Sequence, residues 1–568
     1  MLTVIIADIF FFSDSIEYAT KKVFLLSNRA LLIISLGICL VLILFLKRIG
    51  KVSISYKQVV LALGLASILL FIFQLIIVLN MFFYSGWDAG GVRDSVFEII
   101  NETYNIWYPY SRFPSNINIT ALMVVVAKIS NFIGLNEYIG ILTVNILLVN
   151  LAGFFTFLCA YKLTSSIKHS IFSWIMFTLL VSLSPWISIP YSDTYSILFP
   201  ILAYYLYISR KPKAKIDSRW FFIGFLCFYG ATIKQTVIIV LIAIIIVELL
   251  RTIVQTDNHK WARLLGIVVI VFLSVFPVLL ISSFSKGLLG VEINNEEDFS
   301  IFHLAMMGLN EDTNGVFSQD DIDFSASFKT IEERNTNNIE VIKQRLRDFG
   351  FFGYLKFLAK KILVVFSDGS FAWGVEGNFY QTIPERFSQL SSTLKAIYYN
   401  DGANNLLLIT IEQILWFVVL LFLTAMSLLT KKPDGDKIVL MLIIIGIVSA
   451  LMLFEARARY LYHLSSFFVL GASIGLHLIT EKTIKSRGIL NRALFGERKQ
   501  STEQTNGNIG IDASKNAVPP TAEVSDRDGK MRFVDIRSIA DIGSGTPPIV
   551  DMSAYEVQNN IFLPLIVR

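Results

Sequence analysis

Long apolar runs without charge constrain this chain more than any other feature of its sequence. Runs without Asp, Glu, Lys or Arg occupy residues 30–46, 59–79, 266–281, 417–429 and 439–454. A helix needs about 20 residues to cross the hydrocarbon core of a bilayer. Most of these runs reach that length with their uncharged flanks. Charged residues make up 16% of the chain, against about 25% in an average soluble domain. The sequence therefore predicts an all-α polytopic membrane protein.

Lysine and arginine concentrate in alternate connections between the runs, and this sets the predicted orientation. The positive connections hold Lys47, Arg48, Lys51 and Lys57; Lys162 and Lys168; Arg210, Lys211, Lys213, Lys215 and Arg219; Arg251, Lys260 and Arg263; Lys431, Lys432 and Lys437; and Lys482, Lys485 and Arg487. The connections between them carry acids instead. Because cytoplasmic loops are enriched in Lys and Arg, we expect an external N-terminus and a cytoplasmic C-terminal tail.

This alternation predicts about eleven spans in the cell membrane. They cover residues 24–46, 58–80, 138–160, 170–187, 195–209, 220–232, 235–250, 264–283, 406–429, 438–454 and 460–479. A further apolar segment, 119–135, would break the charge alternation if it crossed, so we expect an amphipathic helix in the outer interface. The stretch 230–235 is expected to form a tight outer turn between two short spans.

The same analysis divides the chain into regions. We expect an additional N-terminal span and cytoplasmic loop (1–57), a catalytic transmembrane core (58–283) with a first outer loop (81–137), an extracytoplasmic loop region (284–405), C-terminal transmembrane helices (406–480) and a polar tail (481–568). The tail is rich in Asn, Ser, Gly, Asp and Thr and is expected to be disordered.

Several function classes find no support in the sequence. The three cysteines, Cys39, Cys159 and Cys227, fall inside apolar runs, so neither a disulfide framework nor a CxxC metal site is indicated. The net charge is +5, but the cations sit in short loops, so no nucleic-acid partner is expected. The N-terminus lacks the pattern of a cleavable signal peptide. Walker, GxGxxG, HExxH and GxSxG motifs do not occur, so the sequence does not indicate a site for nucleotide hydrolysis or nucleotide-sugar chemistry.

Acids next to the predicted outer helix ends are the first candidate site residues. Asp88 directly follows the second span, within GWDAGGVRD. A carboxylate held there can accept a proton from an incoming hydroxyl, although a solvated loop acid would give the same spacing. Asp94 and Glu98 are four residues apart and would share one helix face. Asp193 lies on the next outer connection, within PYSDTY.

Cations near the same side complete the candidate site. Lys234 falls in the outer turn 230–235, where a cation is costly unless it meets an anion or water. FEARARYLY places Glu455, Arg457 and Arg459 at the outer end of a span. Arginines bind phosphate through a planar fork of donors. An ion pair of these arginines with Glu455 is the alternative.

The outer region 284–405 contains a second candidate interfacial helix. Residues 350–366 combine Lys356, Lys360 and Lys361 with Phe, Leu and Val. We expect this helix to lie at the membrane lipid with its lysines reaching lipid phosphates. Asp368, just after it, is a secondary catalytic candidate.

Five motifs together carry a family resemblance: WDAGGVRD, YPYSRFPSNIN, PYSDTY, GATIKQT and FEARARYLY. Their order and sidedness resemble the C-type membrane glycosyltransferases (GT-C), in particular the bacterial members grouped with protein O-mannosyltransferases and lipopolysaccharide sugar transferases. The resemblance covers roughly residues 58–480. It implies a polyprenyl-phosphate sugar donor, an extracytoplasmic active site and inverting transfer, with a glycan or cell-wall polymer as the expected acceptor.

The resemblance also implies roles for individual residues. The catalytic acid of the first outer loop would fall on Asp88, the second-loop acid on Asp193, and phosphate recognition on Lys234, Arg457 and Arg459, with Glu455 beside them. Two departures stand out: an extra span precedes the family core, and WD is followed by GVRD rather than by an adjacent acid. The base is therefore Asp88 or Asp94. A divalent metal could assist, but no ligand cluster requires one, and no other cofactor is implied.

Two other functions compete with this reading. A transporter or flippase of lipid-linked glycans would need polar residues along a path at mid-membrane. Only Glu248 and Glu412 lie at such depth in the predicted spans. A non-catalytic scaffold acting through its tail would leave the clustered outer acids without a role.

Overall fold

The apolar runs form long helices that pack into one bundle. The computed structural model describes residues 1–12, 24–49, 55–81, 83–85, 87–210, 217–254, 259–373, 380–382 and 388–495. Met1–Thr483 form one compact unit and Ile484–Arg568 a second. Within the second unit the described part is helical. The tail predicted to be disordered lies, from residue 496 on, outside the described residues, as do the loop cations Lys51, Lys211, Lys213 and Lys215.

Eight helical segments of the described chain are long and apolar enough to cross a membrane. They are built from α2 (Asn28–Arg48), α3 (Tyr56–Met81), α6 (Glu137–Thr164), η5 with α11 (Gln235–Val237, Ile238–Val254), α12 with α13 (Lys260–Leu273, Val275–Leu289), α19 (Asn405–Leu429), α20 (Gly435–Leu453), and η8 with α21 (Ala458–Leu464, Ser465–Phe495). The multi-pass architecture predicted from the sequence is thereby supported.

The other three predicted spans fall on shorter apolar helices. These are α7 with its π-helical continuation η3 (Ile167–Phe177, Thr178–Ser182), α9 (Leu198–Ile208) and α10 (Arg219–Ile233). None has the length that the eight segments have, so the total of about eleven spans stays a prediction. The expected break at 230–235 is present, because α10 ends at Ile233, Lys234 has an extended backbone and η5 starts at Gln235.

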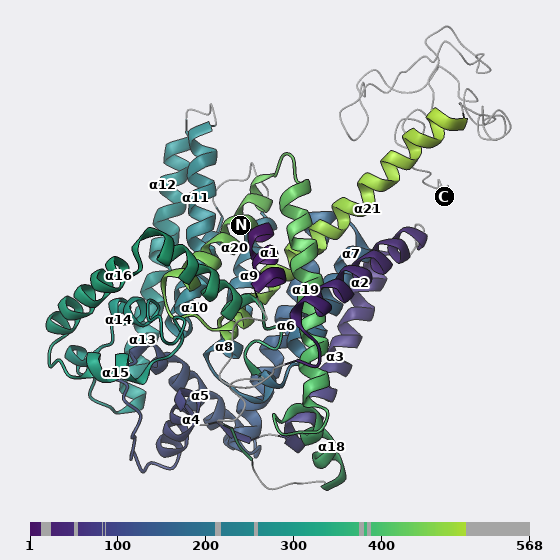
Figure 1. Ribbon diagram of the computed structural model, residues 1–568. Coiled ribbons are helices and arrows are strands. Elements are labelled where there is room, and N and C mark those ends of the chain that lie inside the picture. Colours follow the sequence, from purple (N-terminus) through teal and green to yellow (C-terminus); the bar gives the residue numbers. More distant parts are fainter. Residues whose placement is uncertain are drawn as a thin grey trace, which may run out of the picture. The chain divides into compact units, whose positions relative to one another are not determined.

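The remaining elements of the described chain lie in the connections between these helices (Figure 1). They are α1 (Leu2–Phe12), α4 (Trp87–Ile100), η2 (Pro114–Asn116), α5 (Ile117–Phe132), η4 (Pro185–Ser188), α8 (Ser192–Tyr195), η6 (Asn295–Glu297), α14 (Ile301–Met307), α15 (Gln319–Ala326), α16 (Ile331–Phe366), α18 (Ser388–Tyr398), and the antiparallel strands β1 (Phe83–Ser85) and β2 (Tyr380–Thr382). The segment 119–135, expected to be helical, lies largely in α5. Its place in the membrane interface stays a prediction.

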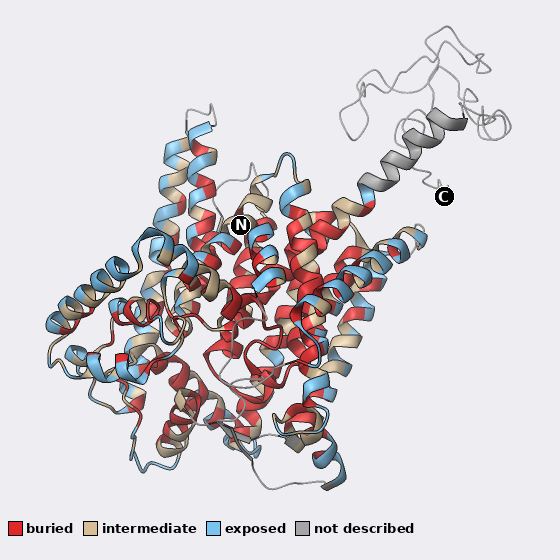
Figure 2. Ribbon diagram, viewed as in Figure 1, coloured by how far each residue is buried: buried red, intermediate tan, exposed pale blue. Residues whose placement is uncertain are grey.

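Helices α19 and α21 form the densest part of the core. The buried share of the helix rises from 17% in α3 to 83% in the segment that starts α21, and Figure 2 shows the buried residues concentrated in the middle of the bundle. Two glycines of α21, four residues apart, allow close packing. A Cβ on Gly475 would lie 1.8 Å from the Phe422 carbonyl oxygen, and one on Gly471 would lie 2.2 Å from Leu423. Small residues at this spacing let membrane helices approach each other closely.

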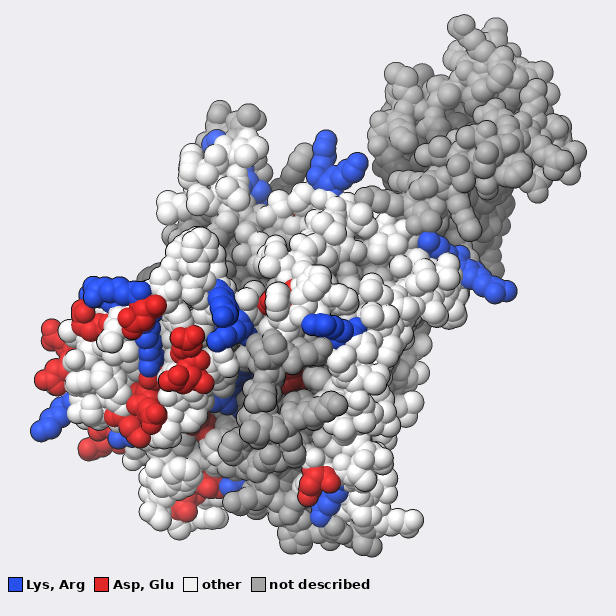
Figure 3. Space-filling model, viewed as in Figure 1, with Lys and Arg blue, Asp and Glu red and all other residues white. Residues whose placement is uncertain are grey.

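A lobe of α14, α15 and α16 packs beside the bundle and carries most of the charge on the face seen in Figure 3. Its helix α16 is longer than the predicted interfacial helix 350–366 and bends at Gly350, where φ is +56°. Phe351 and Phe352 directly after the bend are 72% and 83% exposed.

One expectation for α16 is wrong. Lys361 does not reach toward lipid phosphates, because its side chain is completely buried and donates to backbone carbonyls inside the protein. The apolar and basic pattern identified the helix, but three lysines on one short helix do not share one environment. Lys356 is exposed, whereas Lys360 lies 3.7 Å from Glu311.

Candidate functional site

The motifs singled out in the sequence meet at one place in the fold. Asp88 lies in the first turn of α4, and Asp193 lies in α8. Lys234 follows the last residue of α10, and Glu455 and Arg459 lie where α20 gives way to η8. Each of these residues stands at a helix end, where backbone direction changes and side chains from several helices converge.

Asp88 is held by a relay of hydrogen bonds from the following loop. The Tyr108 hydroxyl donates to Asp88 Oδ1 at 2.9 Å, and Asn116 Nδ2 donates to the Tyr108 hydroxyl at 2.7 Å. The Tyr191 hydroxyl in turn donates to Asn116 Oδ1 at 3.1 Å. Tyr108, Asn116 and Tyr191 are all buried. The relay thus fixes one oxygen of a half-buried carboxylate from the protein interior.

The residue before Asp88 adopts an unusual backbone conformation. Trp87 has φ of +38°, in a region that bulky side chains rarely occupy. Its ring lies 4.1 Å below the Arg459 guanidinium and packs edge-on against Tyr191. Trp186 and Tyr460 also face this guanidinium, at 5.6 and 5.8 Å. Backbone strain of this kind is typical of functional sites that the surrounding structure holds in place.

Asp193 is the shared anion of the two nearest cations. Lys234 Nζ lies 2.8 Å from its Oδ1, and Arg459 Nε lies 3.4 Å from its Oδ2. Burial raises the pKa of Asp193, but Lys234 and Arg459 outweigh burial and the pKa lies below its ordinary value. Burial lowers the pKa of Lys234, and Asp193 offsets part of that effect. Asp193 therefore works as an ionised partner that holds both cations at the site.

Glu455 and Arg457 form the ion pair that the sequence left open. Arg457 Nε lies 2.7 Å from Glu455 Oε1, and the Tyr460 hydroxyl donates to Glu455 Oε2 at 2.7 Å. Burial raises the pKa of Glu455, but Arg457 and Tyr460 bring it below the ordinary value. Arg459 pairs with Asp193 rather than with Glu455, so the two arginines are held by different acids.

The three carboxyl groups of the site therefore differ in character. Burial raises the pKa of Asp88 and dominates over Tyr108 and Arg459, which both lower it. Asp193 and Glu455 have lowered pKa values. Pairs of acids whose surroundings separate their pKa values commonly divide the acid–base and electrostatic roles in an active site. Of the three, Asp88 is the one whose pKa is raised.

Asp94, the other candidate base, lies in a different setting. Its Oδ1 accepts hydrogen bonds from Nε and Nη2 of the adjacent Arg93, at 2.9 Å for Nε. Its side chain is 38% exposed. The geometry therefore favours Asp88 over Asp94.

Metal binding was left open by the sequence. Among the residues that the structure describes, no group of three or more His, Cys, Asp and Glu side chains could hold a metal ion. Lys234, Arg457 and Arg459 instead surround the carboxylates with cations. Asp368, the secondary candidate, accepts bonds from Ser370 and Ala372 in its own turn.

Three buried residues of the site escaped the sequence reasoning. Tyr108, Asn116 and Tyr191 lie in motifs quoted for the family resemblance, but no role was assigned to them. Tyrosines near a membrane surface are common anchors, so their types alone carry little information. The presence of these residues within the quoted motifs YPYSRFPSNIN and PYSDTY was the one available signal.

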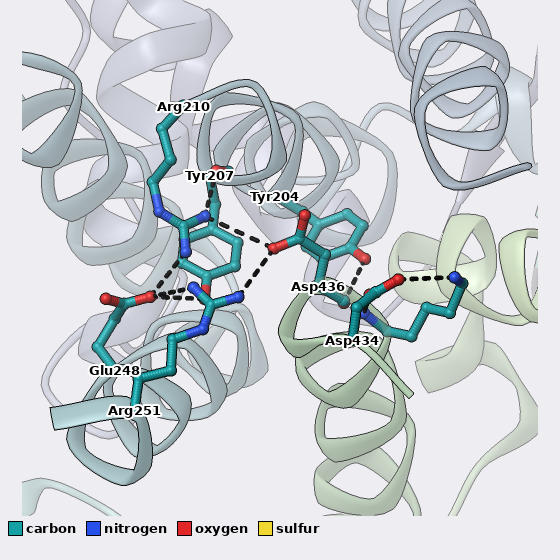
Figure 4. A network of polar contacts seen from close by, with 8 residues as sticks. Tyr204, Tyr207, Arg210, Glu248, Arg251, Asp434 and Asp436 are labelled. Atoms are coloured by element: carbon teal, nitrogen blue, oxygen red, sulfur yellow. Dashed lines mark hydrogen bonds and ion pairs between the residues drawn. The ribbon is translucent and has the colours of Figure 1, made fainter. Parts of the chain in front are cut away.

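Glu248 and Glu412, the two acids predicted to lie at mid-membrane, have different surroundings. Glu248 accepts bonds from Arg210 and Arg251, each at 2.7 Å, and from the Tyr207 hydroxyl at 2.9 Å (Figure 4). Asp436 extends this network to α20, 3.4 Å from Arg251. Glu412 is buried, and within the described chain neither of its oxygens has a hydrogen-bond partner.

Comparisons with known proteins give one family and one structural likeness. A family model described as "Conserved hypothetical integral membrane protein" matches residues 2–478. No curated protein matches. Among solved structures, the crystal structure of the Archaeoglobus fulgidus oligosaccharyltransferase in the apo form aligns with a TM-score of 0.36 and 12% identity, over 75% of this chain and 52% of that one. The chain thus spans about half the length of that structure, and a likeness this weak carries no argument.

Proposed function

The chain belongs to the family described as conserved hypothetical integral membrane protein, and we propose that it is a glycosyltransferase of the cell membrane. The proposed donor is a polyprenyl-phosphate sugar. The proposed acceptor is an extracytoplasmic hydroxyl of a cell-envelope glycan or cell-wall polymer. The GT-C resemblance of the motifs supports the donor class, and the loop charges support the side of the membrane.

One observation carries the proposal. Asp88 directly follows Trp87, whose ring stacks under the Arg459 guanidinium at 4.1 Å. This half-buried carboxylate therefore lies close to a group of cations that Asp193 and Glu455 hold in place. Glycosyl transfer from a lipid phosphate needs both features. A group must accept the acceptor proton, and cations must stabilise the phosphate that leaves.

The proposed reaction is a single displacement at the anomeric carbon. The acceptor oxygen forms a bond to this carbon while its proton passes to the free oxygen of the Asp88 carboxylate. The bond between the anomeric carbon and the phosphate oxygen breaks, and its electron pair leaves with polyprenyl phosphate. The configuration at the carbon inverts. Because the leaving phosphate is a stable anion, no strong general acid is required.

Arg457, Arg459 and Lys234 are the proposed phosphate contacts. Arg459 has its guanidinium plane fixed by Trp87 and its charge balanced by Asp193. A planar, pre-positioned guanidinium loses little freedom when it binds phosphate. Glu455 and Asp193 would then hold the cations in place before the donor arrives.

A transporter or flippase of lipid-linked glycans is the competing function. Its motivation is the buried Glu412, which lies at membrane depth without a hydrogen-bond partner in the described chain. The other deep acid, Glu248, is bound by two arginines and a tyrosine and has the character of a structural ion pair.

Reconstitution separates the two functions. The full-length protein in liposomes would receive a panel of polyprenyl-phosphate hexoses together with envelope glycans extracted from cells that lack the gene. Glycosyl transfer predicts release of free polyprenyl phosphate and a mass increase of one hexose in the glycan. Movement of the donor across the bilayer with its sugar–phosphate bond intact would instead establish the transporter function and contradict the proposal.

A further inference from the structure

Lys361 of α16 has an unusual environment for a lysine. Its side chain is fully buried. Its ammonium donates to the carbonyl oxygens of Gly308, Phe454 and Met452 at 2.7, 2.8 and 3.0 Å. An ammonium has three hydrogens, so these carbonyls use all of them.

The three carbonyls belong to two segments that are far apart in the sequence and in contact in the structure. Gly308 follows α14 in the lobe, while Met452 and Phe454 end α20. Backbone packs directly on backbone here, since a Cβ on Gly308 would lie 2.4 Å from the Phe454 carbonyl carbon. The Ala456 amide also donates to the Gly315 carbonyl at 2.8 Å. Glu455, the next residue after Phe454, is the first residue of the arginine segment.

We infer that Lys361 is a positioning residue that fixes the arginine segment, Glu455 to Arg459, against the lobe. The ammonium holds the carbonyl immediately before Glu455, and the Gly315 carbonyl holds the amide immediately after it. Arg457 and Arg459 are thereby set at the level where the donor phosphate would bind. This inference deepens the proposed glycosyl transfer and rests on it for the identity of the ligand.

The charges around Lys361 make its anchoring sensitive to pH. Burial lowers the pKa of Lys361 to about 7, and Glu455 offsets only part of this effect. Of the other charged groups on the packed elements, Lys360 lies 3.7 Å from Glu311, Arg345 pairs with Asp321, and Arg457 pairs with Glu455. Above pH about 7 the neutral amine keeps two hydrogens for three carbonyls. One carbonyl then loses its donor, and the arginine segment loosens.

The test compares Lys361→Met with Lys360→Met in the full-length protein in nanodiscs. Methionine keeps an unbranched chain of similar length but removes charge and donors. The neighbouring Lys360 is partly exposed and lies 3.7 Å from Glu311 of the lobe, so it controls for loss of a lysine on α16. The readouts are amide hydrogen exchange of peptides covering 454–459, and donor KM and kcat between pH 6 and 9.

The inference predicts faster exchange at 454–459 and a donor KM raised roughly 10- to 100-fold in Lys361→Met, the range typical of a small misplacement of binding groups. In the wild type and in Lys360→Met, donor KM should rise as pH increases through about 7, and in Lys361→Met it should be flat. A merely structural lysine would lower the amount of active protein and leave KM and its pH dependence unchanged, which would overturn the inference. Unchanged exchange at 454–459 would overturn it as well.

The exchange measurement also distinguishes this inference from the proposed function. If the wild type transfers no sugar while Lys361→Met still loosens 454–459, the glycosyltransferase proposal is wrong and the positioning role of Lys361 stands. If the wild type transfers sugar and Lys361→Met behaves as the wild type does, the glycosyltransferase proposal stands and the positioning role of Lys361 is wrong.

Discussion

Asp88, Asp193 and Glu455 lie within one site, but their surroundings give them different acidities. Asp193 and Glu455 each touch a cation within 3 Å. Asp88 contacts a neutral hydroxyl instead. Cations favour the ionised carboxylate strongly, whereas a single hydroxyl donor compensates only part of the cost of burial. The arrangement therefore raises the pKa of Asp88 and lowers the pKa of the other two carboxylates.

Replacing Tyr108 with Phe tests this assignment through pH. Asp88 must be ionised to accept a proton, so transfer should fall as pH drops through its raised pKa. The Tyr108 hydrogen bond lowers that pKa, and Tyr108→Phe should move the acid limb of the kcat profile to higher pH. Tyr110→Phe is a matched control, because Tyr110 bonds Thr120 instead. An acid limb that stays in place would mean that another group titrates.

Replacing Arg459 with Lys tests phosphate recognition. The variant keeps the positive charge but loses the planar group stacked on Trp87. We expect donor KM to rise about tenfold, because a desolvated cation–π contact contributes up to about 2 kcal/mol. Arg457→Lys should have a smaller effect, since an ammonium can keep the ion pair with Glu455. Equal, small effects of both changes in a donor titration would remove the phosphate role.

The sequence identified the charged residues of the site but not their partners. The structure brings the six charged candidates together, because charges next to the ends of apolar runs can be recognised in the sequence. They are Asp88, Asp193, Lys234, Glu455, Arg457 and Arg459. Which acid pairs with which cation depends on the packing of helices far apart in the chain. The misjudged Lys361 has the same origin: an amphipathic pattern gives a helix face, but not the element that covers it.

At the scale of elements, the helix bundle depends on close approach of α21 and α19. Gly475 lies against the Phe422 backbone, so no side chain fits between the two helices at this level. The arginine segment and η8 lead directly into α21. The packing of α21 therefore holds the arginine segment at its C-terminal end, whereas Lys361 contacts the residue before its N-terminal end.

Gly475→Ala should destabilise the protein. A Cβ there would lie 1.8 Å from a backbone oxygen, and overpacking of a core typically costs about 1–3 kcal/mol, occasionally more. Gly64→Ala in α3 is the matched control, since a Cβ at Gly64 meets nothing within 4 Å. Thermal unfolding in detergent would measure both variants. Equal midpoints would contradict the described packing of α21 on α19.

The sequence predicted the ends of some helices but not of others. The long apolar runs and the break before Lys234 gave helices close to those observed. Helix α1 and the first half of α16 were not anticipated. Residues 331–349 are polar and lack an apolar run, so a search for membrane segments passes over them. Contacts of α16 with α14 and α15 stabilise this polar half. A hydropathy pattern does not predict such contacts between helices.

At the scale of the whole molecule, the account requires the site to face outward. Cysteine labelling tests this orientation, and the natural cysteines are buried. Phe132, the last residue of α5, is 91% exposed, and Lys432 lies in the exposed connection before α20, so Phe132→Cys and Lys432→Cys place one label site in each region. An impermeant maleimide should label position 132 in intact cells and position 432 only after permeabilisation. The opposite pattern would place the site in the cytoplasm.

The central claim is that Asp88 removes the acceptor proton during sugar transfer. Asp88→Asn keeps the size of the side chain and an oxygen that can accept the Tyr108 hydrogen bond, but it cannot take up the proton. The measurement is the initial rate of hexose transfer from polyprenyl-phosphate hexose in reconstituted liposomes, at equal amounts of folded protein. A general base typically contributes about 100- to 10,000-fold, so Asp88→Asn should lose that factor. Asp94→Asn, whose carboxylate is bound by Arg93, should stay within a few-fold of the wild type. Near-normal transfer by Asp88→Asn would contradict the account.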